Sequence, residues 1–150
     1  MDTFIEKLCN KYKVSKTDIQ TLLGCMEEVY FKKKELIVRE GTRNNNLYFI
    51  RTGIWRAYYH KDGVDTTIWF ASDGEAAFSV WGYVDNAYSL INIEAMCDSV
   101  AYCISRTALN QLFSSSIGLI IWRSLVQAQA GPLSKSRSYE IRNSFFLAFA

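Results

Sequence analysis

Apolar residues follow three successive patterns along this chain. In residues 1–26 they recur at helical spacing, which predicts two short amphipathic helices. Ser15, with an acid three positions later at Asp18, is expected to cap the second helix. From residue 27 to residue 105, short runs of β-branched and aromatic residues predict strands. Helical spacing returns in residues 106–150.

The strand-like region is organised around one run, residues 47–59, in which two apolar and aromatic segments meet at Gly53. Glycine tolerates backbone angles that other residues avoid, so we expect a sharp bend or bulge there. Further turn signals lie at Gly41, Gly63 and Gly74. Because several turns at short, even spacing are typical of antiparallel sandwiches and barrels, the pattern predicts such a fold.

The remaining runs fit this scheme. Residues 54–71 predict a hairpin, and residues 91–96 and 100–104 predict two closing strands. A short helix is expected to follow, capped by the segment at residues 105–107. Regularity fades in residues 76–92, where aromatic and hydroxyl side chains are frequent. Long loops inside a compact β domain are uncommon unless they bind something, so this segment is predicted to be a binding loop.

The last helical region carries a broad apolar stripe, which predicts a long helix with a surface for pairing. The stripe consists of Ile117, Ile120, Ile121, Leu125 and Val126. Gly131-Pro132 is expected to kink this helix. The sequence stops on an apolar run without a capping pattern, which predicts that it is a piece of a longer chain.

Size and composition narrow the class of protein. The chain has 150 residues and a formal charge of +2, with 49% hydrophobic residues. These values predict one folded domain and give little support for direct binding of nucleic acid. No apolar run is long enough for a membrane span and no signal peptide begins the chain, so we expect a cytoplasmic protein without membrane contact.

Candidate metal and redox residues are few. The four cysteines form no pair with the spacing of a zinc site, and we expect them to be reduced structural thiols. His60 is the only histidine, and it is expected to be a polar residue leading into the turn at residues 61–63. A jelly-roll metal enzyme of the cupin kind needs several ligands around one ion, so neither catalysis nor a bound metal is expected.

Several segments in a fixed order carry a family resemblance. They are residues 34–41, 47–53 and 56–59, Asp62-Gly63, Trp69-Phe70 and Ile93-Glu94-Ala95. With the flanking helices, this order resembles the cyclic-nucleotide-binding sensor domain of the Crp/Fnr family of transcription regulators. The resemblance implies a mainly β fold with flanking helices. It places N-terminal helices at residues 1–26, an antiparallel double-stranded β-helix or jelly roll at residues 27–105, and C-terminal helices, including a long dimerisation helix, at residues 106–150.

In that family a phosphate-binding cassette lies between the hairpin and the closing strands, with a Gly-Glu segment and an Arg before Ser or Thr. The corresponding stretch here has Ser79 about where the glutamate belongs and Ser89 about where the arginine belongs. No Arg or Lys occurs between Thr66 and Val100, so a buried cyclic phosphate would lack its countercharge. We therefore predict weak or absent binding of cyclic AMP.

A less polar small molecule, of unknown identity, suits this divergent cassette better than a nucleotide does. The candidate ligand-binding residues are Phe78, Ser79, Val80, Trp81, Tyr83, Tyr88, Ser89 and Leu90. The alternative is that the aromatic side chains fill the pocket and no ligand binds.

The predicted function is effector sensing and dimerisation in a Crp/Fnr-like transcription regulator, with no cofactor. The apolar stripe would form a homodimer, or would pack on its own β-roll. DNA would be bound only through a helix-turn-helix domain, which these residues do not supply. Two other functions stay open: a stand-alone regulatory or scaffold domain that binds a protein partner, and, more remotely, a cupin-like metal enzyme.

Overall fold

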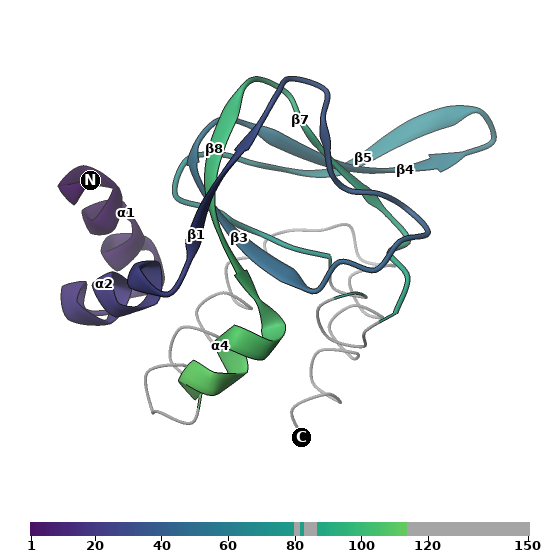
Figure 1. Cartoon of the computed structure of the whole chain (residues 1–150). Coiled ribbons are helices and arrows are strands. Elements are labelled where there is room, and N and C mark those ends of the chain that lie inside the picture. The colour runs from purple at the N-terminus through teal and green to yellow at the C-terminus, as the bar shows by residue number, and fades with distance from the viewer. Residues whose placement is uncertain (80–81, 83–86, 114–150) are drawn as a thin grey trace.

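A computed structural model describes residues 1–79, 82 and 87–113 of the chain (Figure 1). Two helices come first, a series of short strands follows, and a further helix comes last. The helices are α1 (Asp2–Tyr12), α2 (Lys16–Gly24) and α4 (Arg106–Phe113). The strands are β1 (Glu27–Phe31), β2 (Leu36–Val38), β3 (Asn46–Thr52), β4 (Trp55–Lys61), β5 (Val64–Ala71), β6 (Ala76–Ala77), β7 (Asn92–Ala95) and β8 (Ser99–Ser105).

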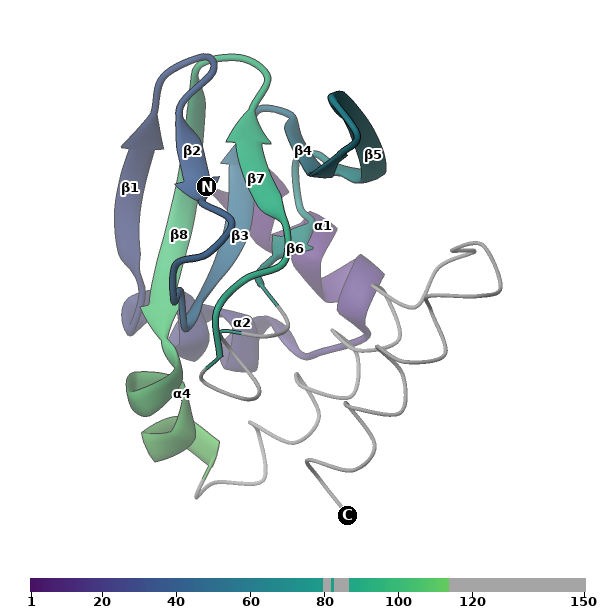
Figure 2. The same cartoon turned by 90° about the vertical axis from the view of Figure 1, so that its right-hand side faces the viewer.

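The strands form two four-stranded sheets with antiparallel pairing throughout. Their orders are β1-β8-β3-β6 and β2-β7-β4-β5. Except for the neighbours β4 and β5, strands that follow one another belong to different sheets, so the chain wraps around a common interior (Figure 2). The predicted mainly β jelly roll with N-terminal helices is confirmed.

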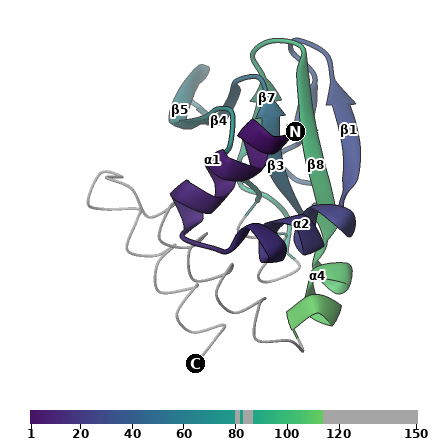
Figure 3. The ribbon, with the colours of Figure 1, turned by 90° about the vertical axis from the view of Figure 1, so that its left-hand side faces the viewer.

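Strand β3 is buried on both of its faces, and this explains why it is apolar without alternation. Leu47 and Phe49 pack with the helices, whereas Tyr48 and Ile50 pack in the core between the sheets. Helices α1 and α2 lie against the outer side of the sheet that contains β3 (Figure 3). The roll therefore has one core between its sheets and a second under its helices.

The serine caps predicted for two helices are confirmed. Ser15 Oγ accepts a hydrogen bond from the Asp18 N–H at 3.2 Å, and Ser105 Oγ accepts one from the Ala108 N–H at 3.2 Å. Each hydroxyl pairs one of the N–H groups that the start of a helix leaves unsatisfied. Within the described ranges no helix is long and apolar enough to cross a bilayer. The predicted long helix with its stripe at residues 117–126 lies outside those ranges.

Gly53 forms the bend between β3 and β4, where the chain passes from one sheet to the other. Its φ of +130° is disfavoured for residues with a side chain. The backbone also approaches β8 so closely that a Cβ on Gly53 would lie 2.3 Å from Ser99 Oγ. The Gly53 N–H donates to Asp73 Oδ1 at 2.8 Å, which ties the bend to the turn after β5.

Trp55 comes directly after the bend and fills the interior of the roll. Its side chain is fully buried and makes edge contacts with Phe31 and Tyr48, at ring-centroid distances of 5.4 and 5.5 Å. Its cross-strand partners are Ala71 and Ala95, and these small side chains leave room for the indole. The bend therefore also sets the position of the largest core residue.

The predicted hairpin at residues 54–71 is confirmed as β4 and β5, joined by a tight turn at Asp62 and Gly63. Both turn residues have positive φ, 53° and 79°, as expected for the primed turns that suit the twist of paired strands. The hairpin projects beyond the body of the roll (Figure 1).

Substitution of Gly53 measures how strongly the bend depends on the missing side chain. We expect Gly53→Ala to lower the free energy of unfolding by more than about 2 kcal/mol, because backbone strain adds to a clash with Ser99. Gly63→Ala is the matched control: its φ is also positive, but a Cβ there meets no atom within 4 Å. Strain alone predicts a loss of about 1 kcal/mol. Equal losses in denaturant titrations of the two variants would contradict the role given to the Ser99 contact.

Candidate functional site

The predicted binding loop connects β6 to β7, and its first and last parts are described. We call residues 78–91 the cassette. Val80, Trp81 and Tyr83, which were predicted to bind the ligand, lie outside the described residues. The other five candidates, Phe78, Ser79, Tyr88, Ser89 and Leu90, have defined positions, and they fall into buried and exposed groups. Their role in ligand binding stays a prediction.

The start of the cassette is buried. Phe78 is 1% exposed and packs in the core under the helices, so its ring is a structural anchor in the helix-side core. Ser79 is fully buried, and its Oγ accepts a hydrogen bond from the Gly82 N–H at 3.4 Å. Of these two candidates, only Ser79 has a polar side chain, and its hydroxyl lies within the cassette.

The end of the cassette is fixed by Ser89. Its N–H donates to the Thr42 carbonyl and its carbonyl accepts from the Gly41 N–H, both at 2.8 Å. The buried Ser89 hydroxyl donates to the Ile91 carbonyl at 2.8 Å. Ser89 therefore works as a backbone bridge to the polar loop after β2, and its hydroxyl is already satisfied.

That polar loop, residues 41–46, supports the cassette from the other side. Asn44 Nδ2 donates to the Ile37 carbonyl at 3.1 Å and to the Tyr48 hydroxyl at 3.2 Å. A Cβ on Gly82 would lie 2.1 Å from the Asn44 carbonyl oxygen, so the two backbones are in direct contact. Asn45 continues the connection, since its carbonyl accepts from the Arg106 N–H at 3.0 Å, at the start of α4. The sequence predicted a turn here but not this supporting role.

The exposed part of the cassette brings an arginine to the site. Tyr88 and Leu90 are 59% and 58% exposed. The Arg43 guanidinium carbon lies 4.7 Å from the centroid of the Tyr88 ring, a cation–π contact. Sequence reasoning found no Arg or Lys in the cassette and missed Arg43, because the loop at residues 41–46 supplies this cation from a distant part of the sequence.

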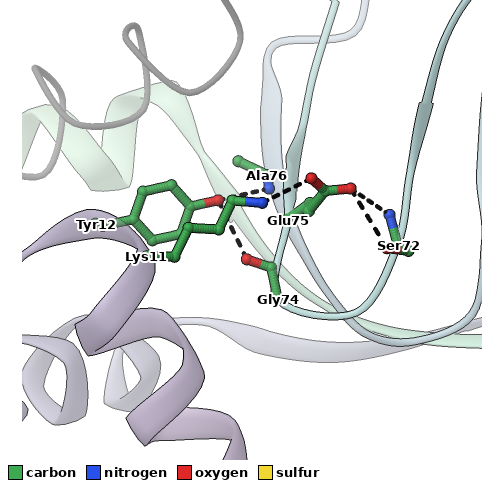
Figure 4. A network of polar contacts seen from close by, with 6 residues as sticks. All are labelled: Lys11, Tyr12, Ser72, Gly74, Glu75 and Ala76. Atoms are coloured by element: carbon green, nitrogen blue, oxygen red, sulfur yellow. Dashed lines mark hydrogen bonds and ion pairs between the residues drawn. The ribbon is translucent and has the colours of Figure 1, made fainter. Parts of the chain in front are cut away.

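Helix α1 holds the turn that leads into the cassette (Figure 4). The Tyr12 hydroxyl donates to the Gly74 carbonyl at 3.2 Å and accepts from the Ala76 N–H at 3.0 Å. Burial raises the pKa of Tyr12 well above its ordinary value, so the hydroxyl keeps its proton. Beside it, Lys11 Nζ forms an ion pair with Glu75 Oε1 at 2.6 Å. The entry to the cassette is thereby attached to the N-terminal helix.

The described interior carries hydroxyl groups and no charge. In residues 1–79, 82 and 87–113 the buried side chains of polar type are Ser79, Ser89 and Ser99. Burial also raises the pKa of Tyr48, which stays neutral. No three His, Cys, Asp or Glu side chains of these residues gather as metal ligands. Such an interior can bind a molecule by hydrogen bonds and apolar contact.

His60 lies near the tip of the hairpin, away from these contacts. Its side chain is exposed, and its Nδ1 lies 2.8 Å from Asp65 Oδ1 on the neighbouring strand. This agrees with the prediction that His60 is a polar residue leading into the turn.

Comparison with protein families gives a match that covers more than half of the chain. The family described as cyclic nucleotide-binding domain matches residues 28–116. This range begins in β1, includes the whole roll and the cassette, and extends past α4. No curated protein sequence gave a match.

Solved structures share the fold at low sequence identity. A cyclic nucleotide-binding domain from Methylobacillus flagellatus is 20% identical with a TM-score of 0.72, over 93% of this chain and 82% of that one. The catabolite activator protein of Thermus thermophilus is 16% identical with a TM-score of 0.71, over 93% and 62%. The sensor domain of the transcriptional regulator DNR from Pseudomonas aeruginosa is 17% identical with a TM-score of 0.62, over 82% of each chain.

These identities establish a common fold only. The chain also spans just 39% and 43% of the length of two protein kinase A chains that have this fold and were solved with cyclic AMP.

The Tyr12 hydroxyl offers a direct test of the attachment between α1 and the cassette. Tyr12→Phe leaves the Gly74 carbonyl and the Ala76 N–H without this partner in a buried place, so we expect a loss of about 1–3 kcal/mol in unfolding free energy. Amide hydrogen exchange at Ala76 should become faster. In the control Tyr30→Phe, an exposed hydroxyl that contacts Glu28 is removed, and the change should stay within about 0.5 kcal/mol. Similar small effects in both variants would contradict the attachment.

Proposed function

Because this chain belongs to the cyclic nucleotide-binding domain family, we propose that it is the effector-sensing and dimerisation domain of a Crp/Fnr-like transcription regulator. The observation that carries the proposal is a cassette held at both ends, by the Tyr12 contacts before it and the Ser89 bridge at its end, beside an interior in which the described residues bury no charged side chain. A structure of this kind suits ligand binding without catalysis. In a complete regulator, DNA would be contacted by a further helix-turn-helix domain.

The effector is proposed to differ from cyclic AMP. The described interior offers serine hydroxyls and aromatic rings, and no arginine or lysine is buried there. Burial of a phosphate without a paired cation costs several kcal/mol of desolvation free energy. This cost is roughly as large as the binding free energy of a micromolar complex. A small molecule with less buried charge is therefore favoured, and no metal or cofactor is included in the proposal.

In this proposal, a series of hydrogen bonds connects the cassette to α4 and transmits the effect of ligand binding to that helix. Ser89 in the cassette is bonded to the loop at residues 41–46, and Asn45 in that loop is bonded to Arg106 at the start of α4. The apolar stripe at residues 117–126 follows α4 in the sequence. In this proposal, occupancy of the cassette shifts the loop and α4, and so changes how two copies of the stripe pair.

Calorimetric titration with cyclic AMP tests the choice of effector. At ordinary salt we expect no binding tighter than about 100 µM, because the buried phosphate would lack a countercharge. Cyclic GMP should behave in the same way. A dissociation constant below about 1 µM for either nucleotide would contradict the proposed effector class.

Sedimentation analysis tests dimerisation separately. We expect the chain to sediment as a dimer at micromolar concentration and the double variant Ile121→Glu, Leu125→Glu to sediment as a monomer, because two charges would be placed in an apolar seam. Ile54→Glu is the matched control, since Ile54 is an apolar residue of the roll that is 47% exposed. A monomeric parent chain, or a dimer that persists in the double variant, would argue against this seam.

A further inference from the structure

Three exposed apolar side chains share the outer face of the sheet β2-β7-β4-β5. They are Ile54, Phe70 and Met96, which are 47%, 61% and 38% exposed, and we call them the outer patch. Their neighbours in the chain, Trp55, Ala71 and Ala95, are buried in the core between the sheets. Because successive side chains along extended backbone point to opposite faces, the three exposed side chains point away from that core together.

The strand register makes the members of the outer patch neighbours. The Met96 N–H donates to the Ile54 carbonyl at 2.8 Å, so these two residues adjoin. In the next row of the sheet, Arg56 pairs across the strands with Phe70 on one side and with Glu94 on the other. Phe70 is therefore diagonal to Ile54, at a separation that an aromatic side chain can span. Arg56 Nη2 lies 3.8 Å from Glu94 Oε2, and this ion pair forms a polar border.

Exposed apolar side chains that gather in this way are typical of interaction surfaces, whereas exposed apolar residues scattered singly are ordinary. Phenylalanine, methionine and arginine are also enriched in protein interfaces relative to the rest of the surface. Methionine adapts its shape readily to a partner. The composition of the outer patch and its border therefore indicates a binding surface.

The turn between β1 and β2 brings three lysines to the other border of the patch. We call residues 32–34 the lysine turn, and all three are exposed. The Lys34 N–H donates to the Ala95 carbonyl at 2.7 Å, so the lysine turn adjoins the end of β7, where Met96 follows. The β1–β2 and β7–β8 turns lie side by side at the end of the roll away from α4 (Figure 2).

Two carboxylates near the lysine turn are engaged by its backbone. Asp98 Oδ1 accepts from the Lys33 N–H at 2.9 Å, and Asp98 Oδ2 lies 3.6 Å from Lys32 Nζ. Glu35 Oε2 accepts from the Lys32 N–H at 2.8 Å. These contacts fix the shape of the turn, while the Lys32 side chain stays 85% exposed. A rigid turn thus presents lysine side chains to solvent beside the outer patch, where they can attract carboxylates of a partner.

We propose that the outer patch binds an acidic segment of another protein. Apolar side chains of that segment cover Ile54, Phe70 and Met96, and its carboxylates face the lysine turn. Burial of apolar surface supplies affinity, and charge attraction speeds association and sets the orientation. An anionic membrane fits less well, because Glu94 and Asp98 would be brought against lipid head groups of like charge. No residue of the cassette takes part, so this inference goes beyond the proposed sensing function and does not depend on it.

Titrations with three peptides of equal length, followed by nuclear magnetic resonance, test the proposal. The first peptide alternates glutamate with leucine and phenylalanine, the second has lysine in place of glutamate, and the third has serine in place of the apolar residues. We expect the first to shift the amide signals of Ile54, Phe70 and Met96 and to leave that of Ser89 unchanged. The other two should bind at least about tenfold more weakly. Added salt should weaken the first, because the lysines are exposed.

Two matched pairs of substitutions make the test specific. Phe70→Ser should weaken binding of the first peptide at least about fivefold. Val64→Ser, which removes a 63% exposed side chain of the same strand near the hairpin turn, should change it less than about twofold. Lys33→Gln should weaken binding about two- to fourfold, and Lys61→Gln, at the hairpin, should have less effect. All four residues are exposed, so these substitutions should not prevent folding.

Several results would overturn the proposal. These are equal losses in Phe70→Ser and Val64→Ser, equal affinity for the acidic and basic peptides, and no binding of any peptide. Flotation with phosphatidylserine vesicles that is lost in Phe70→Ser would assign the patch to a membrane instead. A dimer that dissociates in Phe70→Ser would assign it to a second copy of this chain. The cyclic nucleotide titrations are independent of these readouts, so failure here leaves the proposed effector class standing.

Discussion

The close approach of the Gly53 backbone to Ser99 is the constraint on which the rest of the roll depends. This contact lets the chain pass from one sheet to the other within two residues, and it leaves no space for a side chain. Trp55 then enters the interior between Ala71 and Ala95, two small neighbours that leave room for an indole. The pairing of β3 with β6 follows on the same sheet and fixes where the cassette begins. The bend at Gly53 therefore influences both the path of the roll and the place where the cassette begins.

The cassette is a segment whose two described ends are held by polar contacts. Before it, the Tyr12 hydroxyl pairs two backbone groups of the turn at residues 74–76. At its end, Ser89 exchanges two backbone hydrogen bonds with the loop at residues 41–46. Buried hydrogen bonds of this kind are costly to break, so they restrict the cassette to few arrangements. Asn45 connects the same loop to α4, because its carbonyl accepts a hydrogen bond from the Arg106 N–H.

Local signals in the sequence were sufficient for most of the fold. Ser15 and Ser105 marked helix starts, Gly53 marked the change of sheet, and Gly63 marked the hairpin turn, because each is governed by backbone chemistry within a few residues. The candidate site could be predicted less completely from local sequence patterns. Phe78, a predicted ligand-binding residue, packs in the helix-side core, and local sequence does not reveal this packing. Its role in ligand binding stays a prediction. Arg43 and Tyr12 were missed because loop packing and helix docking bring them to the cassette across long stretches of sequence.

Native mass spectrometry of the protein purified from its own host tests the central claim most directly, namely that this roll senses a small molecule other than a cyclic nucleotide. The account predicts a retained small organic molecule whose mass differs from that of any cyclic nucleotide and which is released on unfolding. A retained mass equal to that of cyclic AMP or cyclic GMP would contradict it.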